Sequence, residues 1–300
     1  MSNILKNNST DVVLPVVSIG MPVYNGGKYI REALDSLLMQ SFSNFELIIS
    51  DNASTDDTAA ICQQYAVKDS RIRYKRQHVN IGALANFTFV LEQAHGEYFM
   101  WAAADDKWDS NWIEMLLNAM KESATNAAFG KIQSIDEHSQ KLCHYVNDLT
   151  FDYRGIRWYR QLKYFLQFEG AGKANPIYGL WNTADLREIK LGNYSYDYLI
   201  VFDLLSKTEI AGSSESIFYK RIHPDAAGGG MHKNSNKGIN ATARIMLRHL
   251  VNPIPDGLIS EYVRLASGNK ALLIVALPFK YLVAYCFMIS NNRFFSKDLS

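Results

Sequence analysis

Three apolar runs near the start of the chain each stop abruptly at polar or acidic residues, and no other feature constrains the fold as strongly. The runs and the residues that follow them are Val16–Met21 with Pro22–Asn25, Leu47–Ser50 with Asp51–Asp56, and Tyr98–Ala103 with Ala104–Trp108. Buried parallel strands read as continuous apolar runs, and open α/β sheets bind ligands beyond the carboxyl ends of their strands. The pattern therefore predicts a parallel sheet with a polar, partly acidic pocket at one edge.

Helices are expected between these strands. Strand candidates are 16–21, 45–50, 72–75 and 98–103, and helix candidates are 27–39, 57–67, 83–95 and 110–120. Within 27–39, the apolar residues Ile30, Ala33, Leu34 and Leu37 recur at the helical spacing of three and four. This alternation indicates right-handed βαβ crossovers and an α/β fold, with a mainly parallel, Rossmann-like central sheet flanked by helices.

The alternation weakens in the second half of the chain. We expect short strands at 127–130 and 132–135, a helical insertion at 150–173, a helix at 195–206 and a last strand at 216–220. Three successive glycines at 228–230 favour a flexible loop over 226–238. The expected organisation is an α/β domain over 12–225 that carries the pocket, the Gly-rich loop, and a helical C-terminal extension over 239–300.

Composition and charge narrow the class of protein. The formal net charge is +1, which offers no global attraction for nucleic acid. Cys62, Cys143 and Cys286 are odd in number and lack metal-binding spacing, which favours reduced thiols in the cytoplasm. The polar N-terminus, 1–11, has no apolar core of a secretory signal. We therefore expect a cytoplasmic protein that binds no nucleic acid.

The segment 271–290 is about as long and apolar as a membrane span requires. Pro278 and Lys280 interrupt it near the centre, where a lysine costs roughly 2.5–3.5 kcal/mol on insertion scales. From residue 232 onward there are nine Lys and Arg against three Asp and Glu, nine minus three leaving +6. Three interpretations stay open: a helix on the cytoplasmic membrane face, making 239–300 a peripheral contact, a core or oligomer-interface helix, and a true span.

Several well-known catalytic motifs are missing. No Gly-x-Gly-x-x-Gly follows the first strand, and the chain has no Walker-type lysine loop, His-Glu-x-x-His or Cys-x-x-Cys. The phosphate cradles of nicotinamide enzymes and P-loop ATPases are therefore absent from the sequence. What remains is the acidic pocket expected at the strand ends.

Taken together, these segments resemble the family 2 glycosyltransferases, which have the GT-A fold. The matching residues are Pro22–Asn25, Asp51–Asp56, Asn80–Gly82 with Asn86, Asp105–Trp108, and Arg221–His223. Each motif alone is short, but their order and spacing along the chain make the set specific.

The resemblance implies a nucleotide-sugar site at the first three strand ends. The residues expected to bind the nucleotide sugar are Pro22, Tyr24, Asn25, Asp51, Arg76, Asn80, Gly82, Asp106 and Arg221. Asp51 would accept the imide N–H of uracil. From the residues alone, Asp51 fits a turn or cap aspartate as well, and Arg76 and Asn80 fit a surface loop.

The resemblance also implies a divalent cation, Mg²⁺ or Mn²⁺. Ala103-Ala104-Asp105 occupies the place of the family's Asp-x-Asp element, and Ala103 departs from it by lacking the first carboxylate. Asp105 would hold the cation, with His223 as a metal or phosphate partner. Asp106 either compensates for Ala103 or caps the following helix.

Transfer with inversion requires a base that removes the proton of the acceptor hydroxyl. The family's base is an aspartate at the start of a late helix, and Asp197 matches that place. An aspartate in a first helical turn is also stabilised by the helix dipole alone. Asp203 is the poorer candidate, since six further positions turn it to another helix face.

The predicted function is an inverting glycosyltransferase of surface polysaccharide synthesis. It would move a sugar from a nucleotide donor, a UDP-sugar, to a hydroxyl of a glycan or lipid-linked glycan. Two alternatives stay open: a sugar-phosphate nucleotidyltransferase, and a non-catalytic nucleotide-sugar-binding module, which Ala103 favours.

Overall fold

The structure is a computed structural model that describes residues 14–144, 146–167, 172–194, 197–223, 258–266 and 270–295. The predicted Gly-rich loop 226–238 lies outside these residues, as does the start of the C-terminal extension. The predicted boundaries at 12 and 225 also lie outside them.

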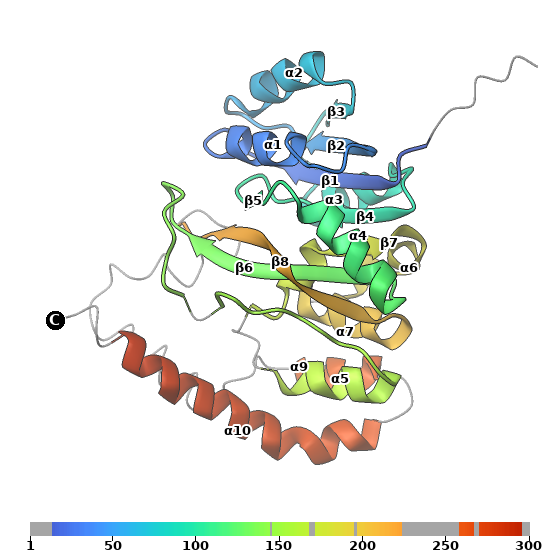
Figure 1. The fold of residues 1–300 in the computed structure, drawn as a ribbon, viewed down its shortest axis with the longest axis vertical. Coiled ribbons are helices and arrows are strands. Elements are labelled where there is room, and N and C mark those ends of the chain that lie inside the picture. The colour runs from blue at the N-terminus through green and yellow to red at the C-terminus, as the bar shows by residue number, and fades with distance from the viewer. Residues whose placement is uncertain are drawn as a thin grey trace, which may run out of the picture.

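An eight-stranded sheet forms the centre of the described part of the chain (Figure 1). Its strands are β1 Val17–Val23, β2 Phe45–Asp51, β3 Ile72–Arg76, β4 Tyr98–Trp101, β5 Lys107–Trp108, β6 Ala127–Ile135, β7 Leu180–Asn182 and β8 Ile210–Arg221. Their spatial order is β3-β2-β1-β4-β7-β6-β8-β5. The predicted α/β fold with a mainly parallel sheet is confirmed.

Strands β3, β2, β1 and β4 are parallel neighbours, as the apolar runs predict. The crossovers between them are α1 Ile30–Leu38, α2 Thr58–Lys68 and α3 Ala83–Glu92. Strand β7 is antiparallel to both β4 and β6, so β6 and its parallel neighbour β8 share the direction of β1. The carboxyl ends of β1, β2, β4, β6 and β8 therefore meet at one edge.

The predicted face of α1 packs on the sheet, with Ile30, Ala33, Leu34 and Leu37 fully buried. The remaining helices are α4 Trp112–Ser123, α5 Arg157–Leu166, η1 Asn175–Tyr178, α6 Thr183–Arg187, η2 Leu191–Asn193, α7 Asp197–Lys207, α9 Leu258–Leu265 and α10 Lys270–Phe295. Figure 1 shows α2 and β3 at one end of the molecule, and α5, α9 and α10 at the opposite end.

Gly130 does not divide two short strands, as the sequence suggested, but lies inside the single long strand β6. A Cβ there would come within 2.3 Å of the Trp112 side chain and 2.6 Å of the Ser216 carbonyl oxygen. The glycine permits this close approach, and the register with β8 shifts between Phe129 and Lys131. The predicted helical insertion, 150–173, is helical only over α5 among its described residues, 150–167 and 172–173.

The C-terminal extension is helical where the structure describes it, as predicted. Helix α10 packs against α5 and α9. None of the helices in the described ranges is long and apolar enough to cross a membrane.

Candidate functional site

The loops after β1 and β2 are tied together by side chains. Asn25 has a positive φ of 53°, which asparagine tolerates better than most residues. Its backbone N–H donates to Ser54 Oγ at 2.9 Å, and its own Oδ1 accepts from the Thr55 N–H at 2.8 Å. Asp56 accepts from the Gly27 N–H at 2.9 Å. These bonds fix the ends of the two strands before any ligand binds.

Asp51, at the end of β2, is fully buried and bonded to protein groups. Its carboxylate accepts from the Ser54 N–H at 2.8 Å and from the Tyr74 hydroxyl at 2.9 Å. Arg76 Nε lies 3.5 Å away and the same guanidinium donates to the Ser54 carbonyl oxygen. Asp51 thus shapes the loop, and its contact with a base stays a prediction.

Three asparagines after β2 and β3, which we call the amide cluster, are Asn52, Asn80 and Asn86. Asn52 Nδ2 donates to Asn80 Oδ1 at 2.9 Å, and Asn52 Oδ1 accepts from the Ile81 N–H at 2.8 Å. Asn80 Oδ1 also accepts from the N–H of Gly82, whose φ of 85° suits glycine. Asn86 bonds in both directions with Ser50.

The amide cluster lines a cavity of about 180 Å³ at the strand ends. Its walls are Pro22, Val23, Tyr24, Asn52, Asn80, Ala83, Asn86 and Phe87. The structure thus brings together three of the predicted residues, Pro22, Tyr24 and Asn80. Phe87, in the first turns of α3, was not predicted, because an aromatic residue in a helix reads equally well as core.

A second group, the charged cluster, consists of Asp105, Asp106, Asp197, Lys220 and His223. The Asp106 carboxylate has no exposed surface and accepts from the Arg221 N–H at 2.7 Å. Lys220 Nζ lies 3.1 Å from its second oxygen. Burial raises the pKa of Asp106 to about 6, and the charge of Asp105 adds to this against the opposing charge of Lys220.

Lys220 stays charged in this cluster. Burial alone would lower its pKa, but Asp106, Tyr178 and Asp105 together hold the pKa of Lys220 well above its usual range. Its Nζ also lies 5.1 Å from the centre of the Tyr178 ring. Burial raises the pKa of Tyr178 to about 12, with contributions from the charges of Asp106, Asp197 and Asp105. These groups therefore act on one another electrostatically.

Asp105 and His223 form the contact that bears on metal binding. His223 Nε2 lies 2.9 Å from Asp105 Oδ2, and the imidazole is 7% exposed. This distance is that of a hydrogen bond or ion pair between the two side chains. His223 Nδ1 is buried and has no hydrogen-bond partner among the residues that the structure describes. Both side chains are of the kinds that bind divalent cations.

The donor set is small. Within the residues that the structure describes, no group of three or more His, Cys, Asp or Glu side chains is arranged to hold a metal ion. Asp105 and His223 therefore fit a cation that takes its remaining oxygens from water and a diphosphate, as Mg²⁺ commonly does.

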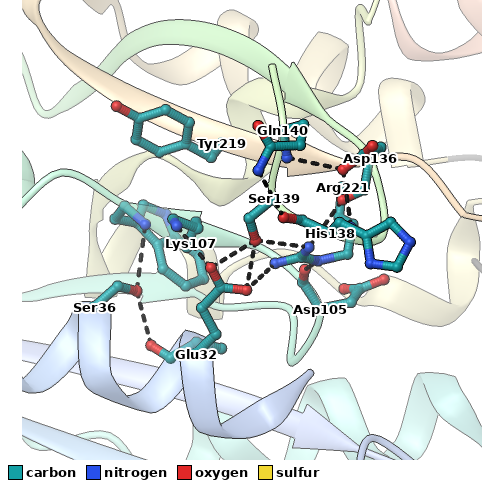
Figure 2. A network of polar contacts seen from close by, with 12 residues as sticks. Glu32, Ser36, Asp105, Lys107, Asp136, His138, Ser139, Gln140, Tyr219 and Arg221 are labelled. Carbon is teal, nitrogen blue, oxygen red and sulfur yellow. Dashed lines mark hydrogen bonds and ion pairs between the residues drawn. The ribbon is translucent and has the colours of Figure 1, made fainter. Parts of the chain in front are cut away.

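Arg221 lies behind Asp105 and is 1% exposed. Its Nε donates to the Asp105 carbonyl oxygen at 2.7 Å, and its terminal nitrogens reach Glu32 and Ser139. Figure 2 shows these residues around one another, with Lys107 on the other side of the Glu32 carboxylate. All of these contacts are with protein, so Arg221 positions Asp105 here and its diphosphate contact stays a prediction.

Glu32, from α1, is the anionic centre of that network. Burial alone would raise its pKa, but hydrogen bonds from Lys107 and Ser139 and the charge of Arg221 hold the pKa of Glu32 at about 2. The sequence shows no sign of this role, since Glu32 is one of several charged residues on an amphipathic helix.

Asp197 is the first residue of α7, as predicted. Its side chain is exposed, yet the protein around it raises the pKa of Asp197 above the usual aspartate range, against the charge of Lys220. The neighbouring candidate Asp203 accepts from the Tyr194 hydroxyl at 2.6 Å instead.

The loops that follow β1, β4 and β8 contact one another. A Cβ on Gly26, after β1, would lie 3.3 Å from the Ala104 Cβ, just before Asp105. The Tyr29 ring, also after β1, packs 4.8 Å from the His223 ring. The two clusters therefore lie at the same edge of the sheet.

Lys220 was missed because the sequence argument selected its neighbour. Adjacent residues of a strand point to opposite faces, so only one of Lys220 and Arg221 can face Asp197 and Tyr178. The alternation of side chains along β8 would have identified Lys220 only if it had been known which face of the strand lies toward Asp197.

A family model described as glycosyl transferase family 2 matches residues 18–174, just over half of the chain. The chain belongs to this family. The sequence-based prediction of a family 2 glycosyltransferase is thereby confirmed. The matched region contains the amide cluster, Asp105 and Asp106, whereas Asp197, Lys220 and His223 lie beyond it.

Curated relatives of this glycosyltransferase family agree. The chain is 31% identical over 136 residues to the glycosyltransferase GlyG of Streptococcus pneumoniae serotype 4, covering 45% of each chain. It is 35% identical over 141 residues to the putative teichuronic acid biosynthesis glycosyltransferase TuaG of Bacillus subtilis, covering 46% of this chain and 56% of TuaG. The chain therefore spans about half the length of these relatives.

Solved structures show the same fold over nearly the whole chain. The structure of S. aureus TarS 1–349 in complex with UDP matches with a TM-score of 0.57 and 17% identity, covering 92% of this chain and 91% of that one. The predicted GT-A fold is confirmed by this likeness.

Proposed function

We propose that the chain is an inverting glycosyltransferase that transfers a sugar from a UDP-sugar to a hydroxyl of a glycan or lipid-linked glycan. The observation that carries the proposal is the 2.9 Å contact of Asp105 with His223, electrostatically linked through Lys220 and Tyr178 to the exposed Asp197. The cavity beside it, lined by the amide cluster, supplies room for a base and ribose.

The donor side of the proposal rests on the cavity and on the family. Tyr24 and Phe87 offer ring faces to a flat base, and Asn80 and Asn52 offer amides at the cavity wall. TarS, which shares the fold, has been crystallised with UDP and with UDP-GlcNAc. The proposed setting in surface polysaccharide synthesis follows from the relative TuaG.

Asp105 and His223 would hold Mg²⁺ or Mn²⁺, which when bound supplies Lewis-acid neutralisation of the departing diphosphate. Arg221 and Glu32 keep the Asp105 main chain in place for that purpose. Lys220 adds a positive charge to the same region, which favours an anionic leaving group.

Asp197 is the proposed base. Its carboxylate takes the proton of the acceptor hydroxyl while the hydroxyl oxygen bonds to the anomeric carbon and the bond to the nucleoside diphosphate breaks. A single displacement of this kind inverts the anomeric centre. The raised pKa of Asp197 makes it a stronger base than an ordinary aspartate, which suits proton transfer near neutral pH.

The test compares Asp197→Asn with Asp203→Asn, on the same helix. UDP release from UDP-sugars is followed with Mn²⁺ and acceptor extract, and UDP affinity is measured by calorimetry. Asp197→Asn is expected to lower turnover about 10²–10⁴-fold with nearly unchanged UDP affinity, whereas Asp203→Asn retains activity. Equal turnover of Asp197→Asn and the parent would disprove the base assignment.

The same preparation separates the alternatives. Pyrophosphate release from UTP and a sugar 1-phosphate would favour a nucleotidyltransferase. UDP-sugar binding without transfer or hydrolysis of any donor in the presence of metal would favour a binding module.

A further inference from the structure

Helix α10 presents its apolar side chains outward and its lysine inward. Leu273, Ala276 and Lys280 are buried against the domain. The exposed large side chains on the described part of the helix are Ile274, Val275, Phe279, Tyr281, Leu282 and Val283. A helix at the surface of a water-soluble domain normally shows the opposite arrangement, with its charged residues toward solvent.

Lys280 has a specific reason to point inward. Its Nζ donates to the Phe165 carbonyl oxygen at 2.6 Å, at the C-terminal end of α5, and lies 3.4 Å from the Gln167 carbonyl oxygen. A helix C-terminus carries partial negative charge, which stabilises a cation. The ammonium also lies 4.8 Å from the centre of the Phe165 ring. These contacts fix the orientation of α10 about its own axis. The exposed apolar side chains of the helix, which we call the apolar stripe, therefore face away from the domain.

The charges on α10 indicate what covers the stripe. The helix contains Lys270, Lys280 and Arg293 and has no Asp or Glu. Lys280 is bound to α5, so the charges in the helix sequence that are left for a partner are Lys270 and Arg293. A second copy of the chain packed through α10 would bring the same cations and no anion. An anionic bilayer offers opposite charge to the helix and an apolar layer to the stripe.

We propose that the stripe of Ile274, Val275, Phe279 and Leu282 rests in the surface of an anionic membrane. The helix then lies in the plane of the interface, with Lys280 still bound to α5. Figure 1 shows α10 along the outer edge of the molecule, on the far side of α5 from the sheet. The contact is independent of the proposed sugar transfer, because a chain without transferase activity would bind membranes equally well.

The experiment uses the full chain and vesicles of phosphatidylcholine with or without phosphatidylglycerol. Val275→Asp is compared with Val67→Asp, which makes the same change at the exposed end of α2; the two valines are 68% and 89% exposed. Flotation is expected to show binding of the parent and of Val67→Asp to anionic vesicles, within twofold of each other. Val275→Asp is expected to bind at least tenfold more weakly.

Leu282→Asp, at a second exposed position, repeats the test on the same stripe, and thermal unfolding checks that every variant is folded. Equal binding of Val275→Asp and Val67→Asp overturns the proposal, as does equal binding to neutral and anionic vesicles. A parent that binds no vesicle but forms a dimer, dissociated by Val275→Asp, assigns the stripe to a second copy and also overturns it.

Discussion

The amide cluster and the charged cluster occupy one edge of the same sheet but are stabilised in opposite ways. The amide cluster is neutral, and its side chains bond to neighbouring backbone groups or to one another. The charged cluster holds ionic groups with raised pKa values, Asp106 and Asp197, and the unpaired His223 Nδ1. The hydrogen bonds of the amide cluster are made within the protein, whereas the charged cluster carries charge that a ligand can still balance.

This difference suggests how a site divides binding from chemistry. Neutral hydrogen bonds within a loop fix a cavity at little electrostatic cost. Carboxylates with raised pKa values such as Asp106 and Asp197 are costly to the fold when charged, and they recur at sites where reactions develop charge. If the division holds, substitutions in the charged cluster affect stability and turnover strongly, and those in the amide cluster affect mainly affinity.

The largest effect is expected from Asp106→Ala. It leaves the Lys220 ammonium without its carboxylate and removes the acceptor of the Arg221 N–H. Breaking a buried ion pair costs about 3–5 kcal/mol, and the lower end applies because Lys220 retains some exposure. Urea unfolding measures the loss, with the exposed Asp57→Ala as the control. A loss below about 1 kcal/mol would show that the pair contributes no more than a surface ion pair.

Glu32→Gln is expected to weaken metal binding, beyond the stability that it loses by removing the carboxylate partner of the buried Arg221. The substitution removes the anion that holds Arg221 against the Asp105 carbonyl oxygen. Partners that orient a metal ligand typically change affinity 10–100-fold, so we expect about tenfold weaker Mn²⁺ binding in the presence of UDP. Calorimetry measures it, with Glu122→Gln on α4 as the control. Unchanged Mn²⁺ affinity would assign the network to structure alone.

Asn52→Ala is expected to act on the nucleotide side alone. It removes the bonds to Asn80 and to the Ile81 N–H, which are worth about 1 kcal/mol. UDP affinity should fall about fivefold, while turnover at saturating donor stays near that of the parent. A fall in turnover with unchanged UDP affinity would contradict the assignment of binding to the amide cluster and of chemistry to the charged cluster.

Lys220→Met is expected to displace the pH profile, in addition to the stability lost when the buried Asp106 carboxylate is left without its cation. The rate falls on the acid side as Asp197 becomes protonated, and the charge of Lys220 lowers the pKa of Asp197. Without that charge the pKa of Asp197 rises, so the acid limb of kcat/KM moves to higher pH. The exposed Lys68→Met should leave the limb in place. A limb that moves to lower pH would contradict the electrostatic link.

The parts of the fold that the sequence predicted are those encoded locally. Strands β1, β2 and β3 were predicted to within two residues at each end, because apolar runs mark β1 and β2, and apolar residues alternating with basic ones mark β3. Strand β8 was predicted only over 216–220, since its first half, Ile210–Glu215, mixes small and polar side chains.

The site divides along the same line. Pro22 and Tyr24 lie at the end of β1, and Asn80 lies in the loop after β3, so their meeting at one cavity could be predicted from the order of the elements. The contact of Glu32 with Arg221 joins residues 189 positions apart, and the local sequence around either residue does not indicate it. Lys220 required knowledge of which face of β8 looks toward Asp197.

The rotation of α10 about its own axis decides what this end of the molecule offers to its surroundings. One extra residue between Leu277 and Lys280 would turn the following part of the helix by about 100°. The Lys280 ammonium would then be exposed to water and the apolar stripe would turn toward the domain, although the mean hydropathy of the helix would hardly change. The position of a single lysine relative to its apolar neighbours therefore decides whether the outer face of such a helix is apolar or charged.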